Sequence, residues 1–110
     1  MLYIGTNAQN NNRTISTQTN VISVSRDEAE IVNKLLGLSQ EQYRRIYTIY
    51  LEKNSKIKEI KSKYDPNSLT YFTEIAIAEN SADQFVSQEL TISQQVLWTD
   101  ELRVKYTNNK

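Results

Sequence analysis

The sequence predicts an all-α fold of four helices, and three observations lead to that prediction. Only two glycines and one proline occur in 110 residues, which is too few chain breakers for a turn-rich β-sandwich. Apolar residues recur at helical spacing along most of the chain. Helix-capping sequences stand where one helix would end and the next would begin. We expect helices packed as bent hairpins at about residues 26–36, 40–64, 68–89 and 92–106.

Residues 1–23 differ from the rest of the chain in composition. The stretch from Asn7 to Asn20 consists almost wholly of Asn, Gln, Thr and Ser, which offer little to bury. We therefore expect residues 1–23 to be a disordered arm. The chain opens with apolar residues followed by Ala8 and Gln9, and this resembles the end of a secretory signal whose charged opening is missing. A truncated signal peptide predicts a periplasmic protein; without one, the protein is expected in the cytoplasm.

The first helix is predicted from the sequence signals at its two ends. Ser25 and Glu28 have the spacing of a capping box, in which the N-cap hydroxyl and the third helical residue exchange hydrogen bonds with the backbone. Gly37 suits the left-handed conformation that ends many helices. The apolar face between these signals consists of Ile31, Leu35 and Leu36.

The second helix has the strongest periodicity in the chain, because an apolar or aromatic residue recurs every seven positions. Its apolar arc covers roughly 160°, wider than the roughly 100° stripe of an ordinary surface helix, so we expect it to contact more than one neighbour. Asn54 lies inside the arc, either as a solvated interruption or as a polar register device across a dimer. The apolar positions are Tyr43, Ile46, Tyr47, Ile49, Tyr50, Ile57, Ile60 and Tyr64.

The last two helices follow a chain break at Asp65-Pro66-Asn67. Asn67 or Ser68 can cap the third helix, and the fourth carries the sole tryptophan. We expect residues 24–106 to form a single helical domain and residues 107–110 to be a frayed tail. The candidate buried positions of these helices are Leu69, Phe72, Ile75, Ala76, Ala82, Phe85, Val86, Val96, Leu97, Trp98, Leu102 and Val104.

A short motif, Leu-Ser/Thr-x-x-Gln, occurs twice, fifty-two residues apart, and each copy stands at the start of a predicted helix. In each copy the hydroxyl can cap the first turn while the glutamine returns a hydrogen bond to the capping residue's own amide. The leucine can pack against the helix it precedes. The motif residues are Leu38, Ser39 and Gln42 in the first copy and Leu90, Thr91 and Gln94 in the second.

The paired motifs resemble the LTxxQ-motif family of small periplasmic helical proteins, the Spy/CpxP-like proteins. The resemblance covers roughly residues 26–106. It implies four helices per chain and two chains paired antiparallel into a thin curved cradle, whose concave face binds unfolded clients without ATP. Two features depart from the family. Gln95 replaces the apolar partner expected for Leu90, and the chain has no His, no Cys and only Met1 to bind metal, so the metal-sensing function of some members is not carried over.

Charge is distributed unevenly along the chain. Residues 40–64 hold seven basic and three acidic residues, a net charge of +4, whereas residues 65–101 hold seven acidic residues and no basic one. One explanation is that the helices pair through complementary rims. The other is a functional basic face that attracts acidic, partly unfolded chains and holds them by weak apolar contacts. The candidate client-binding residues on this face are Arg44, Tyr47, Leu51 and Lys58.

Composition argues against several classes of function. The chain has no cysteine and no histidine, which removes the thiol nucleophile, the usual general base and the typical zinc ligands. No glycine-rich phosphate loop or nucleophile elbow is present. We therefore expect no enzymatic activity, no catalytic residue, no cofactor and no metal. The formal charge of zero argues against a nucleic-acid partner, and no apolar run is long enough for membrane insertion.

These observations together predict an ATP-independent periplasmic protein that is chaperone-like or acts as an envelope-stress adaptor. Its expected partners are unfolded or partner polypeptides, and we expect it to act as a homodimer. The alternative is a small cytosolic helical protein-protein interaction module, of the kind that phages and plasmids encode.

Overall fold

A computed structural model describes the backbone of residues 5–108 and the side chains of residues 20–107. The predicted all-α fold with four helices is confirmed. The last three helices begin and end within two residues of their predicted bounds. The helices are α1 (Gly5–Leu36), α2 (Gln40–Lys63), α3 (Leu69–Gln88) and α4 (Ile92–Asn108).

The first helix begins far earlier than the predicted residue 26. Ser25 is buried within α1 rather than capping it, and its hydroxyl donates to the carbonyl of Val21 at 2.7 Å, a bond that serine makes readily one helical turn back. The predicted capping box of Ser25 with Glu28 is therefore wrong. Residues 20–23 of the expected arm are helical, and the expected signal remnant and the tail end lie outside the residues whose side chains are described.

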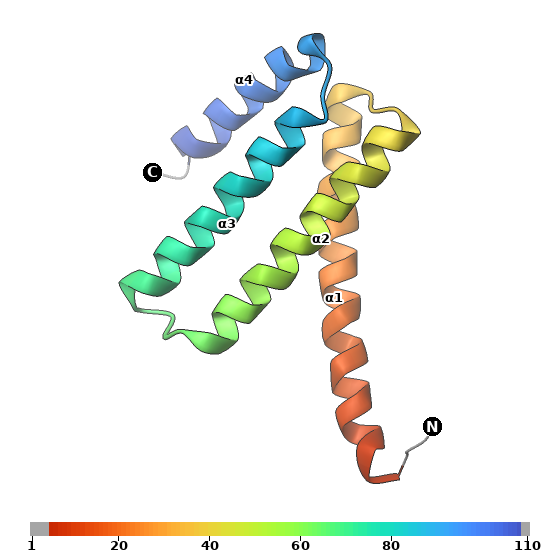
Figure 1. The fold of residues 1–110 in the computed structure, drawn as a ribbon, viewed down its shortest axis with the longest axis vertical. Coiled ribbons are helices and arrows are strands. Elements are labelled where there is room, and N and C mark those ends of the chain that lie inside the picture. The colour runs from red at the N-terminus through yellow and green to blue at the C-terminus, as the bar shows by residue number, and fades with distance from the viewer. Residues whose placement is uncertain (1–4, 109–110) are drawn as a thin grey trace.

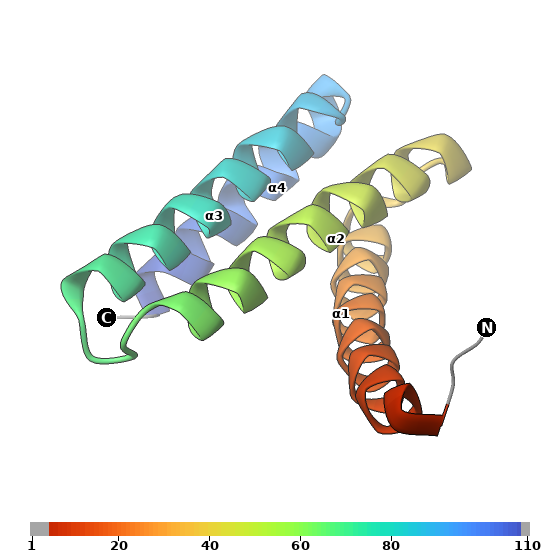
Figure 2. The same cartoon turned by 60° about the horizontal axis from the view of Figure 1, so that its bottom comes forward.

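Each helix packs against the next as a hairpin, and α1 also contacts α4. Figures 1 and 2 show α2 and α3 running side by side with α4 folded back along α3, whereas α1 diverges from α2 away from their shared turn. All four helices therefore meet at the end that holds the α1–α2 and α3–α4 turns, and α1 separates from the other three toward the other end. The shortest dimension is 19 Å, about two helix diameters.

The hydrophobic core lies toward the end where these two turns meet. It draws on all four helices, and α2 contributes to it while contacting both α1 and α3, as its wide apolar arc predicted. Ile60 is buried separately, nearer the α2–α3 turn. The core residues are Ala29, Val32, Leu36, Ile46, Tyr50, Val86, Leu90 and Trp98.

Several candidate core positions are instead exposed, because a fold this thin buries only one narrow side of α1, α3 and α4. The buried side of α3 is set by Ala82, Asp83 and Val86, so most of its larger apolar residues point elsewhere. Of the predicted α4 positions, Trp98 is 6% exposed whereas Val96 is 61% exposed. The exposed candidates are Ile31, Leu35, Leu69, Phe72, Ala76, Phe85, Val96, Leu97 and Val104.

None of the helices in the described part of the chain combines the length and the hydrophobicity that crossing a membrane requires.

Candidate functional site

Both copies of the repeated motif form the predicted capping hydrogen bonds. At the start of α2, the Ser39 amide donates to Gln42 Oε1 at 2.9 Å and the Gln42 amide donates to Ser39 Oγ at 3.0 Å. At the start of α4, the Thr91 amide donates to Gln94 Oε1 at 2.9 Å and the Gln94 amide donates to Thr91 Oγ1 at 3.2 Å. Each glutamine thus satisfies an amide that its helix leaves without a backbone partner.

The two motif glutamines also bind each other, which makes the copies one structural unit that we call the glutamine pair (Gln42 and Gln94). Gln42 Nε2 donates to Gln94 Oε1 at 2.8 Å and to the carbonyl of Glu89 at 2.9 Å. Gln94 Nε2 donates to Gln42 Oε1 and to the carbonyl of Gly37, both at 3.3 Å. Glu89 holds the place in the second turn that Gly37 holds in the first, so the contacts are related by an approximate two-fold axis.

The residues around the glutamine pair fix the two turns in which it lies. Gly37 has a φ of +66°, the left-handed conformation that its position predicted, and the following amide of Leu38 donates to Asn33 Oδ1 at 3.0 Å. Leu90 is buried in the core, and the partly buried Leu38 packs against that core. Gln95, which departs from the motif pattern, donates from Nε2 to the carbonyl of Ser87 at 3.0 Å and so satisfies the end of α3.

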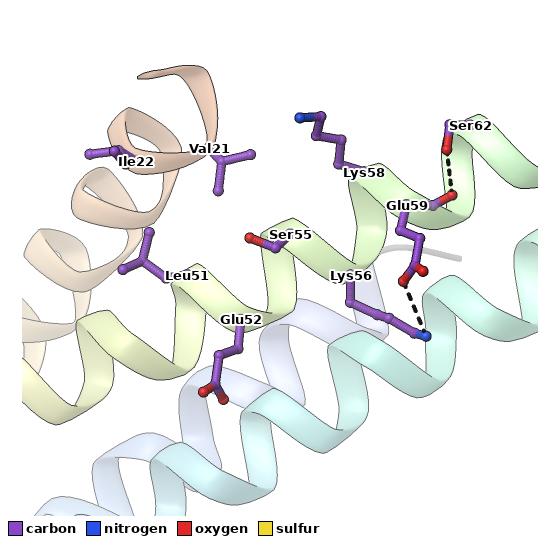
Figure 3. A pocket seen from close by; sticks show the side chains of 9 residues that line it. All are labelled: Val21, Ile22, Leu51, Glu52, Ser55, Lys56, Lys58, Glu59 and Ser62. Carbon is purple, nitrogen blue, oxygen red and sulfur yellow. Dashed lines mark hydrogen bonds and ion pairs between the residues drawn. The ribbon is translucent and has the colours of Figure 1, made fainter. Parts of the chain in front are cut away.

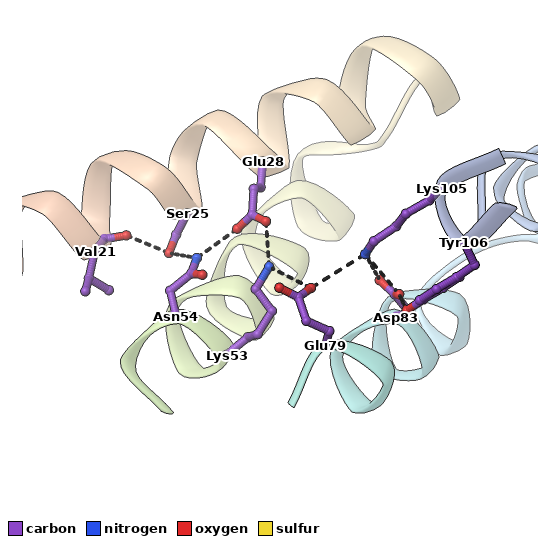
Figure 4. Close-up of polar contacts among 9 residues, drawn as sticks. All are labelled: Val21, Ser25, Glu28, Lys53, Asn54, Glu79, Asp83, Lys105 and Tyr106. Carbon is purple, nitrogen blue, oxygen red and sulfur yellow. Dashed lines mark hydrogen bonds and ion pairs between the residues drawn. The ribbon is translucent and has the colours of Figure 1, made fainter. Parts of the chain in front are cut away.

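Beyond the core, eight polar side chains link all four helices in what we call the four-helix network (Figure 4). Its α1–α2 half is centred on Lys53, whose side chain is only 4% exposed. Lys53 Nζ lies 2.5 Å from Glu28 Oε2 and 4.9 Å from the centre of the Tyr50 ring. Asn54 Nδ2 donates to Ser25 Oγ at 2.9 Å and to Glu28 Oε1 at 2.8 Å. Asn54 is thus an intrachain link between α1 and α2.

The α3–α4 half of the network joins the first half through Glu79, whose Oε1 lies 3.5 Å from Lys53 Nζ and 3.6 Å from Lys105 Nζ. Lys105 Nζ also lies 3.2 Å from Oδ2 of the buried Asp83, which accepts a hydrogen bond from the Tyr106 hydroxyl. The network consists of Ser25 and Glu28 from α1, Lys53 and Asn54 from α2, Glu79 and Asp83 from α3, and Lys105 and Tyr106 from α4.

Burial, with the acidic side chains of this network, raises the pKa of two tyrosine phenols. Burial raises the pKa of the Tyr50 phenol, and the nearby Asp83 carboxylate adds to the rise. Burial also raises the pKa of Tyr106, and its hydrogen bond to Asp83 favours the protonated phenol further. Both groups therefore hold their protons more tightly than a free tyrosine does.

Ion pairs between α2 and the acidic residues that follow it partly balance the uneven charge along the chain. Lys53 pairs with Glu79, and Arg45 NH1 lies 3.4 Å from Glu89 Oε1, as the hypothesis of complementary rims predicted. Not every basic residue of α2 has such a partner. Within the described part of the chain, the basic residues of α2 that form no ion pair are Lys58, Lys61 and Lys63.

A groove of about 850 Å³ lies where α1 diverges from α2 (Figure 3). Val21 and Ile22 line it from α1, and Leu51 lines it from α2. Lys58 lies on its rim near α1, while Glu52 points away from Lys58 toward α3. We call this the α1–α2 groove; its lining is Val21, Ile22, Leu51, Glu52, Ser55, Lys56, Lys58, Glu59 and Ser62.

A second hollow of about 250 Å³ also lies between α1 and α2 and shares Val21 and Lys58 with the α1–α2 groove. Its apolar lining comes from Val24 and Ile57, and Lys61 stands beside Lys58 on its rim. The angle between the two helices therefore presents apolar side chains flanked by two lysines.

The structure brings two of the four candidate client-binding residues together and leaves the other two apart. Leu51 and Lys58 both line the α1–α2 groove, in which Leu51 is half-buried. Arg44 is exposed beside Glu41, 2.5 Å away, and Tyr47 packs against the core; neither lines the groove. Sequence reasoning missed the α1 side of the groove, because Val21 fell in the expected disordered arm.

The residues that the structure describes contain no cluster of three or more His, Cys, Asp or Glu side chains arranged to hold a metal ion. No family model, no curated protein and no solved structure matches this chain. Any function proposed for this protein therefore rests on the geometry of the glutamine pair, the four-helix network and the α1–α2 groove.

Proposed function

We propose that this protein binds unfolded or partner polypeptides without ATP, and that the α1–α2 groove receives them. One observation carries the proposal. The glutamine pair joins the turns at one end of the fold, and α1 and α2 diverge away from that end, which leaves apolar side chains of both helices uncovered beside unpaired lysines. A groove of about 850 Å³ has room for several side chains of an extended or helical segment.

Charge and apolar surface would act in sequence on a client. Lys58 and Lys61 attract acidic segments at long range, and this attraction weakens as salt screens it. Val21, Ile22 and Leu51 then contact apolar side chains of the client over a small area. Such contacts are weak and release easily, which suits a protein that protects chains without consuming ATP.

The wider surface supports association with a second copy. Large apolar side chains of α3 and α4 remain exposed, among them Leu69 at 81%, Ile92 at 83% and Val96 at 61%. Exposed apolar side chains that lie close together are typical of interaction surfaces. We propose a homodimer, and the resemblance of the paired motifs to the LTxxQ-motif family supports both that state and a periplasmic chaperone or stress-adaptor function.

The test is a light-scattering assay in which an unfolded acidic protein aggregates with and without this chain. The wild type is expected to slow aggregation at low salt and less so at high salt. Leu51→Ser with Lys58→Ser is expected to lose most of the protection while keeping its helical circular dichroism.

A matched control is Ile31→Ser with Lys34→Ser, which removes one exposed apolar and one basic residue of α1 outside the α1–α2 groove and is expected to protect like the wild type. No protection by the wild type at several-fold excess and low salt would remove the chaperone function. Tight binding to one folded protein together with no effect on unfolded clients would favour the interaction-module alternative.

A further inference from the structure

The four-helix network places two of its charged groups, Lys53 and Asp83, where the fold gives them little water, while Glu28, Glu79 and Lys105 are about a third exposed. Lys53 is 4% exposed and has carboxylates from two other helices within 3.5 Å, and the side chain of Asp83 is 7% exposed between Lys105 and Tyr106. Three carboxylates and two ammonium groups thus join α1 and α4 to the α2–α3 hairpin. A buried ammonium group is tolerated only while its carboxylate partners are ionised.

We propose that the four-helix network is an acid-operated latch, in which protonation of Glu28, Glu79 and Asp83 releases α1 and α4 from the α2–α3 hairpin. Lys53 and Lys105 stay charged in acid, so each loses its counter-ions at once. The charged groups facing Lys53 are Glu28 from α1 and Glu79 from α3, with the Tyr50 ring from its own helix.

The composition of the turns explains why loss of the network would separate the helices without unfolding the protein. The glutamine pair in the two turns consists of neutral side chains and backbone groups, which do not titrate between neutral and acid pH. The turns therefore stay joined while the helices separate beyond them. The separation widens the cleft between α1 and α4, whose apolar lining includes Val32, Leu35, Trp98 and Leu102.

The consequence for clients rests on the proposed function, because α1 carries Val21 and Ile22 of the α1–α2 groove. Release of α1 widens that groove and adds core surface to it. Acid would thus raise the capacity for unfolded polypeptides under conditions that unfold many other proteins. The opening itself is independent of any client and can be measured without one.

Trp98 reports the opening directly, since it is the only tryptophan, is 6% exposed and donates from Nε1 to the carbonyl of Asp83 at 3.3 Å. The wild type is titrated from pH 7 to about pH 2, where carboxyl groups are protonated. The expected result is a red-shifted emission and a several-fold rise in quenching by acrylamide, with far-ultraviolet circular dichroism still helical.

The decisive variant combines Glu28→Gln, Glu79→Gln and Asp83→Asn, which mimics the protonated network at neutral pH. It is expected to show the acid form's Trp98 exposure at pH 7 and little further change in acid. The control combines Glu74→Gln, Asp100→Asn and Asp27→Asn, which neutralises three acids outside the network and is expected to behave like the wild type.

Three outcomes would overturn the latch. Trp98 could stay shielded in the wild type at pH 2, it could stay shielded in the network variant at pH 7, or its exposure could coincide with loss of helix in a single unfolding step. If Trp98 becomes exposed as expected and client protection is still absent, the latch stands and the proposed function fails.

Discussion

The side-chain amides of Gln42 and Gln94 exchange hydrogen bonds across the two interhelical turns, although the residues are fifty-two positions apart. Each glutamine also caps its own helix and donates to a carbonyl of the other turn. Side chains that bond in such a closed set stabilise one another beyond the sum of their separate bonds. The glutamine pair thereby fixes where the helices meet and, by consequence, where they are free to diverge.

Replacing either glutamine is expected to destabilise the fold in a coupled way. Gln42→Ala removes bonds to Ser39, Glu89 and Gln94, and with about 0.5 to 1.5 kcal/mol for each bond we expect a loss of about 2 to 3 kcal/mol in the free energy of unfolding. Urea unfolding of Gln42→Ala, Gln94→Ala and the double variant should give a coupling energy of about 1 kcal/mol. Additive losses would show that the two side chains act separately, and the exposed Gln40→Ala serves as the neutral control.

Gly37→Ala tests the left-handed end of α1. A Cβ at this position meets no atom within 4 Å, so the expected cost comes from the φ of +66° alone and is about 1 to 2 kcal/mol. Gly37→Asn should lose less, because asparagine tolerates this conformation. Equal stability of the alanine variant and the wild type in urea unfolding would contradict the observed turn.

Lys53→Ala is expected to be among the most damaging substitutions on α2. It leaves Glu28 and Glu79 without their shared cation. Both carboxylates are about a third exposed, so water partly compensates them and the expected cost is about 2 kcal/mol, below the roughly 3 to 5 kcal/mol of a fully buried pair. Lys56→Ala, three residues away, removes only an exposed pair with Glu59 and should change stability by less than about 1 kcal/mol. Thermal unfolding of the two variants side by side gives the comparison, and similar melting temperatures would contradict the buried network.

The raised pKa values of Tyr50 and Tyr106 predict a loss of stability in alkali. Well below about pH 10 both phenols are protonated in the folded and the unfolded chain, so they do not change the free energy of unfolding with pH. Above that value the unfolded chain loses protons that the folded chain retains, and the free energy of unfolding falls as pH rises. Tyr106→Phe should make this fall shallower, as measured by urea unfolding at successive alkaline pH values; an unchanged slope would contradict the contribution of Tyr106.

The sequence predicted the helices at 40–64, 68–89 and 92–106 because their boundaries rest on local chemistry. The Ser39 capping box and the break at Pro66 act within a few residues of where they stand. The prediction of a helix start at Ser25 was wrong because a serine with a glutamate three residues later satisfies the same local rule whether the chain begins a helix there or continues one. Its hydroxyl bonds to Val21 and accepts from Asn54 of α2, and the second contact depends on the tertiary fold.

The groove and the network were harder to foresee because each joins residues from different helices. The repeated motif indicated two similar turns. Gln42 and Gln94 hold the same position in the two copies, and this equivalence was the available signal that the two turns lie together. Leu51 and Lys58 were found because both lie on the strongly periodic α2. Lys53 and Asp83 carried no signal of burial, since charged residues are rarely buried unless they are paired, and their partners lie on helices whose orientation only the fold defines.

The central claim is that polypeptides bind between α1 and α2, in the region where these helices diverge. Photo-cross-linking tests it most directly, with a photoreactive phenylalanine analogue placed at Leu51 in the α1–α2 groove or at the exposed Val96 on α4, and an acidic, permanently unfolded protein as the client. The account predicts client cross-links from position 51 that weaken with added salt, and few from position 96. Cross-links that are equal from both positions, or that come from position 96 alone, would contradict it.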